Sequence, residues 1–106
     1  QRLALARAWA MRPRLLLLDE PTASLDPSAT EAVERIIREI RTEGAKVLMT
    51  THNLGQATRL ADDIVFLAEG RVQEHEPAQR FFAHPQSPAA RAFMQGELPW
   101  RIAFDR

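Results

Sequence analysis

Two adjacent carboxylates and one histidine are the residues of this sequence whose types and positions favour chemistry. Asp19 and Glu20 directly follow the apolar run at residues 15–18, and His52 follows a β-prone run at residues 46–51. Because successive side chains of a strand point to opposite faces, Asp19 and Glu20 cannot do the same job. One carboxylate can hold a hydrated Mg²⁺, which prefers oxygen ligands, and the other can orient an attacking water. The Asp-Glu-Pro triplet alone fits a charged strand exit and turn equally well, because short motifs also match by chance.

The elements that must position these residues alternate between the strand and helix types. Short apolar runs bounded by turn residues predict strands, and longer runs with helical periodicity predict helices. Helices are expected at residues 1–12, 27–43, 53–61, 77–83 and 88–94, strands at 14–19, 46–51, 63–68 and 71–74, and no clear period at 96–106. The strand at 14–19 is expected to be buried, since it is short, apolar and flanked by prolines.

The helix at residues 27–43 carries the clearest signals. Asp26 is a good N-cap and is followed by a first-turn proline, Pro27. Gly44 is expected to end the helix. The apolar positions recur with the period of an amphipathic helix, at Val33, Ile36, Ile37 and Ile40. The charged residues on its other side, Glu31, Glu34, Arg35, Arg38, Glu39 and Arg41, are expected to form a solvated face with helical ion pairs.

The order of elements predicts an α/β layer with parallel strands and crossover helices, followed by a hairpin and short helices. Functional groups of such layers gather at the carboxyl ends of the strands. Two strands should therefore deliver Asp19, Glu20 and His52 to one edge of the sheet.

Composition excludes several classes of function. Fourteen basic and fourteen acidic residues give a net charge of zero, and there is no cysteine. We therefore expect no nucleic-acid partner and no thiolate metal site. The apolar run at 15–18 is far too short to cross a bilayer.

Four motifs in one order resemble the ATP-binding subunits of ABC transporters. LLLLDEPTASLD, residues 15–26, resembles the Walker B motif and D-loop of that family. QRLALARAWAMRP, residues 1–13, resembles the helix after the LSGGQ signature, and His52 in LMTTHN matches the H-loop histidine. ADDIVFLAEGRV, residues 61–72, resembles the hairpin that follows. The resemblance covers residues 1 to about 82 and implies part of a P-loop NTPase (RecA-like) layer.

The resemblance also implies roles for single residues, with ATP and Mg²⁺ as cofactors. Asp19 would coordinate Mg²⁺, and Glu20 would be the general base that polarises the attacking water. His52 would contact the γ-phosphate. Ser24 and Asp26 would reach toward the nucleotide site of a second subunit across a dimer.

Other parts of the family's site are not found in the sequence. The 106 residues contain no GxxxxGK[ST] phosphate loop, no Q-loop and no LSGGQ peptide. We therefore expect residues 1–106 to be the C-terminal part of a nucleotide-binding domain, a fragment that is inactive alone. The expected partners are membrane-spanning permease subunits, a second nucleotide-binding subunit in a homodimer and, indirectly, a substrate-binding protein, at the cytoplasmic face of the membrane.

The transported substrate is a finer question. Residues 51–74 and the stretch FMQGELPW, residues 93–100, resemble importers of oxyanions such as tungstate and phosphate. An amino-acid importer is the next alternative. A non-transport ABC ATPase of DNA repair, chromosomes or ribosomes, and a remnant without enzymatic activity, also remain open.

Overall fold

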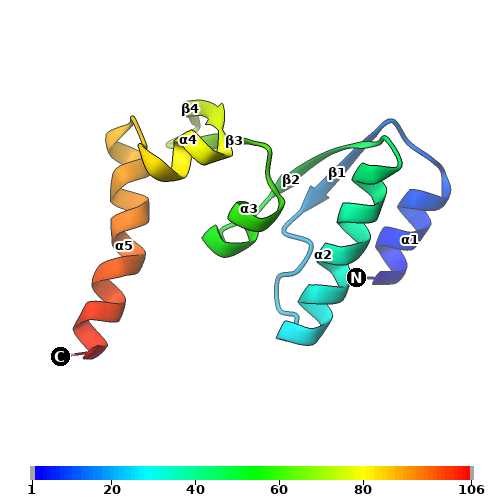
Figure 1. Ribbon diagram of the computed structural model, residues 1–106, viewed down its shortest axis with the longest axis horizontal. Coiled ribbons are helices and arrows are strands. Elements are labelled where there is room, and N and C mark those ends of the chain that lie inside the picture. The colour runs from blue at the N-terminus through cyan, green and yellow to red at the C-terminus, as the bar shows by residue number, and fades with distance from the viewer. Residues whose placement is uncertain (1, 106) are drawn as a thin grey trace. The chain divides into compact units, whose positions relative to one another are not determined.

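The computed structural model describes the backbone of residues 2–105 and the side chains of residues 2–96. The chain divides into two compact units, residues 1–56 and 57–106 (Figure 1). The first unit contains α1 (Arg2–Ala10), β1 (Leu15–Asp19), α2 (Pro27–Thr42), β2 (Lys46–Thr50) and the start of α3 (Leu54–Leu60). The second contains the rest of α3, then β3 (Asp63–Ala68), β4 (Arg71–Pro77), α4 (Ala78–Ala83) and α5 (Pro88–Asp105). The α/β class and the order of elements agree with the prediction.

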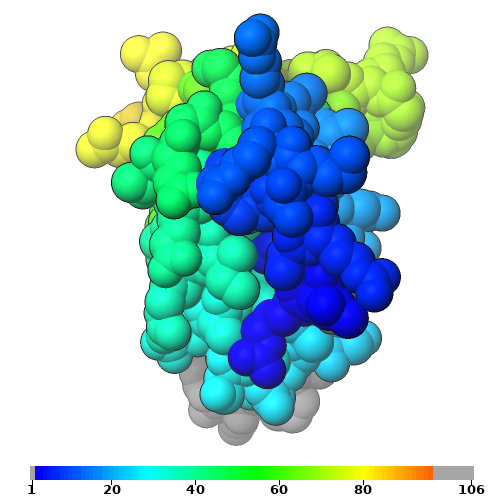
Figure 2. All heavy atoms as spheres, turned by 90° about the vertical axis from the view of Figure 1, so that its right-hand side faces the viewer, coloured from blue at the N-terminus to red at the C-terminus, as the bar shows by residue number. Residues whose placement is uncertain are grey.

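β1 and β2 pair in parallel, and α2 is the crossover between them. The register places Leu16 opposite Val47 and Asp19 opposite Thr50, so the two strands end level with each other. α2 packs against β2, and α1 and α2 lie side by side in the ribbon view and in the space-filling view (Figures 1 and 2). The carboxyl ends of two parallel strands thus meet at one edge, as the element order predicts.

Only one face of this two-stranded sheet is covered within the first unit. Leu16 is buried, whereas Leu15, Leu17 and Leu48 are more than half exposed. These three side chains alternate with the covered ones along the strands. The prediction of a fully buried strand is therefore wrong for Leu15 and Leu17, because the helices of the unit cover the other face.

α2 begins and ends as the sequence predicts. The Asp26 carboxylate accepts a hydrogen bond from the Ala29 N–H at 2.7 Å, and Pro27 follows in the first turn. Gly44 lies just past the end with φ of 107°, a conformation that favours glycine. The buried stripe consists of Val33, Ile37 and Ile40, each 2% exposed or less. Burial of each such side chain contributes about 1.5–3 kcal/mol.

In the second unit, β3 and β4 form the predicted hairpin. They pair antiparallel, and the turn residues Glu69 and Gly70 have φ of 55° and 73°. Positive φ at both central residues is the type of turn that matches the twist of a hairpin. β4 continues to Pro77, beyond the predicted end at residue 74, and Pro77 is also the N-cap residue of α4. β3 pairs with β4 in a sheet of its own.

Three phenylalanines form the apolar contacts between the hairpin and the helices of the second unit. The ring of Phe66 lies 5.9 Å from that of Phe81 and 5.6 Å from that of Phe93. Phe81 is 2% exposed. These separations lie in the range in which tilted aromatic pairs attract each other.

A buried carboxylate joins β4 to the start of α5. The Ser87 N–H and hydroxyl donate to Glu74 Oε1 at 2.7 and 2.8 Å, and the Ser87 hydroxyl oxygen accepts from the Ala90 N–H. Burial opposes ionisation of Glu74, but these bonds, together with those from Gln86 and Glu76, hold the pKa of Glu74 below its usual value. Burial and the neighbouring Glu74 carboxylate raise the pKa of Glu76. Glu76 therefore keeps its proton to a higher pH than Glu74 does.

α5 differs from the prediction, which ended the helix at residue 94. The helix continues through Gly96 and Pro99 to Asp105. Residues 96–106 show no clear period in the sequence, and glycine and proline are unfavourable inside helices. Leu98, Arg101 and Ala103 between and after them favour helix. Among the described residues, no helix is both long enough and apolar enough to cross a membrane.

Candidate active site at the carboxyl ends of β1 and β2

Glu20 and His52 meet where the two parallel strands end. His52 Nε2 lies 3.4 Å from Glu20 Oε1, a contact that becomes an ion pair when the imidazole is protonated. The Glu20 side chain is 43% exposed and that of His52 is 84% exposed, so both can be reached by water or a ligand. The structure thus brings together the carboxylate and the imidazole that the strand order assigns to one edge.

Asp19 is held by a residue that sequence reasoning missed. The Thr50 hydroxyl donates to Asp19 Oδ1 at 2.5 Å. Both residues are exposed and end their strands directly opposite each other. Thr50 lies in the β-prone run expected at residues 46–51, but its position opposite Asp19 follows from the register of the paired strands, which the sequence does not show. The hydroxyl fixes the orientation of one carboxylate oxygen.

Thr50 also anchors the backbone of Glu20. The Glu20 N–H donates to the Thr50 carbonyl oxygen at 3.0 Å and lies 3.1 Å from the Thr50 hydroxyl oxygen. Glu20 has φ of 44°, in the left-handed region, so the chain leaves the strand direction at this residue. The turn therefore points the Glu20 side chain in a different direction from that of Asp19.

Ser24 has the same kind of backbone, with φ of 67°, in the exposed turn between β1 and α2. Left-handed φ costs a residue other than glycine about 1–2 kcal/mol. Arg12, which follows α1, and Glu69, in the hairpin turn of the second unit, also have positive φ. Positive φ alone therefore does not mark a functional residue.

Asp26 lies at the end of the same turn, and one of its carboxylate oxygens is already used. Oδ1 caps α2 through the Ala29 N–H. The side chain is exposed. Asp26 therefore has a structural role in addition to the expected role toward a second subunit.

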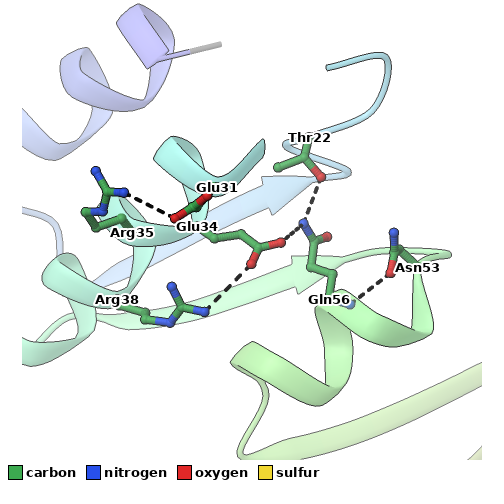
Figure 3. A network of polar contacts seen from close by, with 7 residues as sticks. All are labelled: Thr22, Glu31, Glu34, Arg35, Arg38, Asn53 and Gln56. Atoms are coloured by element: carbon green, nitrogen blue, oxygen red, sulfur yellow. Dashed lines mark hydrogen bonds and ion pairs between the residues drawn. The ribbon is translucent and has the colours of Figure 1, made fainter. Parts of the chain in front are cut away.

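A buried polar network lies behind the site, and sequence reasoning missed it (Figure 3). Gln56 is 1% exposed, and its side-chain amide donates to the Thr22 hydroxyl oxygen at 2.7 Å and to Glu34 Oε2 at 3.1 Å. Its backbone N–H donates to Asn53 Oδ1 at 2.8 Å. The other Glu34 oxygen lies 3.7 Å from the Arg38 guanidinium.

Glu34 corrects the prediction of a solvated charged face on α2. It is 3% exposed, because it lies at the edge of the apolar stripe next to Val33. The predicted helical pairs do form, Glu31 with Arg35 at 3.5 Å and Glu34 with Arg38. Position beside the stripe was the signal that could have marked Glu34 as buried.

The donor set fits a hard cation. Asp19 offers carboxylate oxygens on the exposed face of the strand pair, with the Thr50 hydroxyl beside them. Mg²⁺ prefers such oxygens and commonly takes one or two carboxylates while phosphates and waters complete its coordination. Asp19 is therefore a suitable residue to hold it.

A family model described as "AAA domain, putative AbiEii toxin, Type IV TA system" matches residues 1–55. The solved structure of CbiO1 from Clostridium perfringens, described as part of the ABC transporter complex CbiONQ, is similar with a TM-score of 0.69. It is 32% identical, and the match covers 78% of this chain and 34% of that one.

Curated relatives are ATP-binding proteins of importers. The phosphate import ATP-binding protein PstB of Aeropyrum pernix is 46% identical over 99 residues, which are 92% of this chain and 39% of the relative. The histidine/lysine/arginine/ornithine transport ATP-binding protein HisP of Escherichia coli is 39% identical over 98 residues, 92% of this chain and 38% of the relative. The glutamine transport ATP-binding protein GlnQ of Geobacillus stearothermophilus is also 39% identical.

The chain therefore belongs to the AAA-domain family, with the α/β fold of the P-loop NTPases. Its relatives are ATP-binding subunits of ABC transporters, which confirms the resemblance that the four motifs indicate. The chain spans somewhat less than two fifths of the length of these curated relatives.

Proposed function

We propose that this segment supplies the hydrolytic carboxylate and histidine of an ATPase subunit that drives ABC-type import. The observation that carries the proposal is the contact of Glu20 and His52 at 3.4 Å, on the exposed edge where β1 and β2 end. Residues 1–106 would form the C-terminal part of the nucleotide-binding domain. The ATP-binding relatives over 92% of the chain support this assignment.

Glu20 would act as the general base. Its carboxylate is accessible to water, and its backbone is fixed by the N–H bond to Thr50. A positioned base accepts the proton of the attacking water as the water adds to the γ-phosphorus. His52, on the other side of the contact, would hold the γ-phosphate oxygens in line with that water. Such preorganised donors stabilise the charge that develops in the transition state.

Asp19 would hold Mg²⁺, directly or through a water ligand. The hydrogen bond from Thr50 already orients its carboxylate on the exposed face. When bound, the cation neutralises the charge of the phosphate oxygens. The different directions of Asp19 and Glu20 keep the metal-binding and base roles apart.

The partners belong to the same proposal. Ser24 and Asp26, in the exposed turn before α2, would reach toward the nucleotide of a second copy in a homodimer. ATP hydrolysis would drive the membrane-spanning permease subunits. A substrate-binding protein would be an indirect partner of the ATPase. The ATPase would lie at the cytoplasmic face of the membrane.

For the substrate we propose an oxyanion such as phosphate or tungstate. Two phosphate-import relatives, at 46% and 47% identity, support it. An amino-acid importer is the second candidate, supported by the HisP and GlnQ relatives at 39%. Uptake of labelled phosphate and of labelled amino acids separates the two classes, if cells with the intact ATPase are compared with cells that carry Glu20→Gln.

The test of the hydrolytic role uses the full-length ATPase, meaning this segment within a chain of the relatives' whole length. Glu20→Gln keeps the size of the side chain but cannot accept a proton. The maximal ATPase rate should fall by about 10²–10⁴-fold, while ATP remains bound in an equilibrium binding assay. A Glu20→Gln variant with half the wild-type rate would show that Glu20 is not the base.

A further inference from the structure

The contact between Glu20 and His52 cannot fix its own geometry. Both side chains are substantially exposed, at 43% and 84%. An exposed ion pair contributes about 0–1 kcal/mol, too little to hold two side chains in one arrangement. The pairing of β1 with β2 and the Glu20 N–H bond to Thr50 hold the two strand ends together. A further contact is needed to hold the segments that follow the strands, at residues 20–22 and 52–56.

Gln56 joins these two segments from the buried side (Figure 3). It lies four residues after His52, and its amide reaches Thr22, two residues after Glu20, at 2.7 Å. The same amide reaches Glu34 of α2 at 3.1 Å. The turn after β1, the helix α2 and the start of α3 thus meet at one side chain that is 1% exposed.

An amide at position 56 suits the chemistry of the network. A carboxylate only accepts hydrogen bonds, so the buried Glu34 needs a donor, and the Gln56 amide nitrogen has two N–H groups to give. One can serve Glu34 and the other Thr22. A glutamate of the same shape at position 56 would remove both donors and place two carboxylates next to each other in a buried site.

We propose that Gln56 is a positioning residue for hydrolysis. By bonding Thr22 and Glu34 at once, it holds the segment that carries Glu20 and the segment that carries His52 in register. The inference rests on the proposed function, because it assigns Gln56 to the same reaction. Gln56 itself does not touch the reacting atoms; it acts through Glu20 and His52.

The first experiment measures kcat and KM for ATP in the full-length ATPase with Gln56→Glu. Misplacement of a catalytic group by about 1 Å can cost 10²-fold in rate, so kcat should fall roughly 10- to 100-fold. KM should change by less than about 2-fold, since loss of an interaction that matters in the transition state lowers kcat. Thr22→Val, which deletes the hydroxyl with little change of shape, should lower kcat in the same direction, and Thr22→Ser is its matched control.

Reversal of the network separates positioning from general damage. In the double variant Glu34→Gln/Gln56→Glu, an amide at position 34 can donate to a carboxylate at position 56, and the Thr22 hydroxyl can donate as well. We expect kcat of this double variant to be at least about 10-fold higher than kcat of Gln56→Glu. Glu34→Gln alone should have a small effect, because its carbonyl oxygen still accepts from Gln56.

A second background tests whether Gln56 acts through the base. In a Glu20→Gln background, Gln56→Glu should lower the residual rate by clearly less than the roughly 10- to 100-fold expected when Glu20 is present, because one of the two groups that it positions is already lost. Provided that the wild-type enzyme hydrolyses ATP, any one of three results would overturn the inference. These are an unchanged kcat in both Gln56→Glu and Thr22→Val, no recovery of kcat in the double variant, or a full additive loss of rate in the Glu20→Gln background. A folded wild-type enzyme without ATPase activity would instead refute the proposed function.

Discussion

Substitutions of Asp26 can separate two roles of its carboxylate, the N-cap of α2 and the proposed contact with a second subunit. Its Oδ1 accepts the Ala29 N–H at 2.7 Å, so Asp26→Ala leaves the first turn of α2 without its side-chain acceptor. Asp26→Ser restores a capping oxygen but not a negative charge, because serine is also a preferred N-cap residue. Asp26→Ala therefore removes the cap and the charge together, whereas Asp26→Ser removes the charge alone, and the difference between the two variants isolates the cap.

The expected size follows from the geometry. The bond at 2.7 Å is short, the residue is exposed, and loss of such a cap typically costs about 1 kcal/mol of stability. In a protein of about 150–250 residues, 1 kcal/mol lowers the unfolding temperature by roughly 2–4 °C. Asp26→Ser should lower it by less than about 1 °C, since the replacement of one preferred capping residue by another is nearly neutral.

The assay is thermal unfolding followed by circular dichroism, run on the same samples as the steady-state ATPase rate. If Asp26 acts only as a cap, Asp26→Ser should keep both the stability and the rate. If its carboxylate also acts across the dimer, Asp26→Ser should keep the stability but lose rate. An Asp26→Ala variant as stable as the wild type would refute the reasoning about the cap.

Three further predictions concern the edge of the parallel strands and the carboxyl pair of the hairpin. Asp19→Asn should raise the Mg²⁺ concentration at half-maximal ATPase rate, because a neutral amide is a poorer ligand for a hard cation, whereas Glu20→Gln should leave that concentration nearly unchanged; identical Mg²⁺ titrations of the two variants would contradict the division of roles. His52→Ala should lower kcat by at least about 10²-fold with a much smaller change in the dissociation constant for ATP, and equal losses in both would contradict its role toward the γ-phosphate. Since the pKa of Glu76 is raised in the folded protein, its contribution to stability is present at low pH and is lost as the pH rises through that value. Glu76→Gln offers an amide donor beside Glu74 at every pH, so its unfolding temperature should increasingly exceed that of the wild type as the pH rises above the usual range of a glutamate. A difference that does not change with pH would contradict the raised pKa of Glu76.

Local signals in the sequence predicted the elements well. The cap at Asp26, the glycine after α2 and the stripe of Val33, Ile37 and Ile40 define α2 from residues that act within a few positions of one another. The turn at Glu69 and Gly70 is equally local. Such features need no knowledge of distant contacts, so they can be derived before the fold is known.

The supporting parts of the site depend on contacts between distant segments. Gln56 meets Thr22 across 34 positions and Glu34 across 22, and no local pattern marks a glutamine as buried. The exposure of Leu15 and Leu17 likewise depends on which face of the strand pair is covered. In α5, the backbone stays helical past residue 94 although residues 96–106 show no clear period.

The parallel pairing of β1 and β2 has a consequence for the order in which the molecule folds. Asp19 and Thr50 are 31 positions apart, and α2 lies between them. Contacts at such separation require closure of a long loop, which slows their formation, whereas helices form from neighbouring residues. α2 can therefore form before the strands that it connects have paired. The edge with Glu20 and His52 then arises only at the end of this sequence of events, and a growing chain acquires it only after residue 52 has been synthesised.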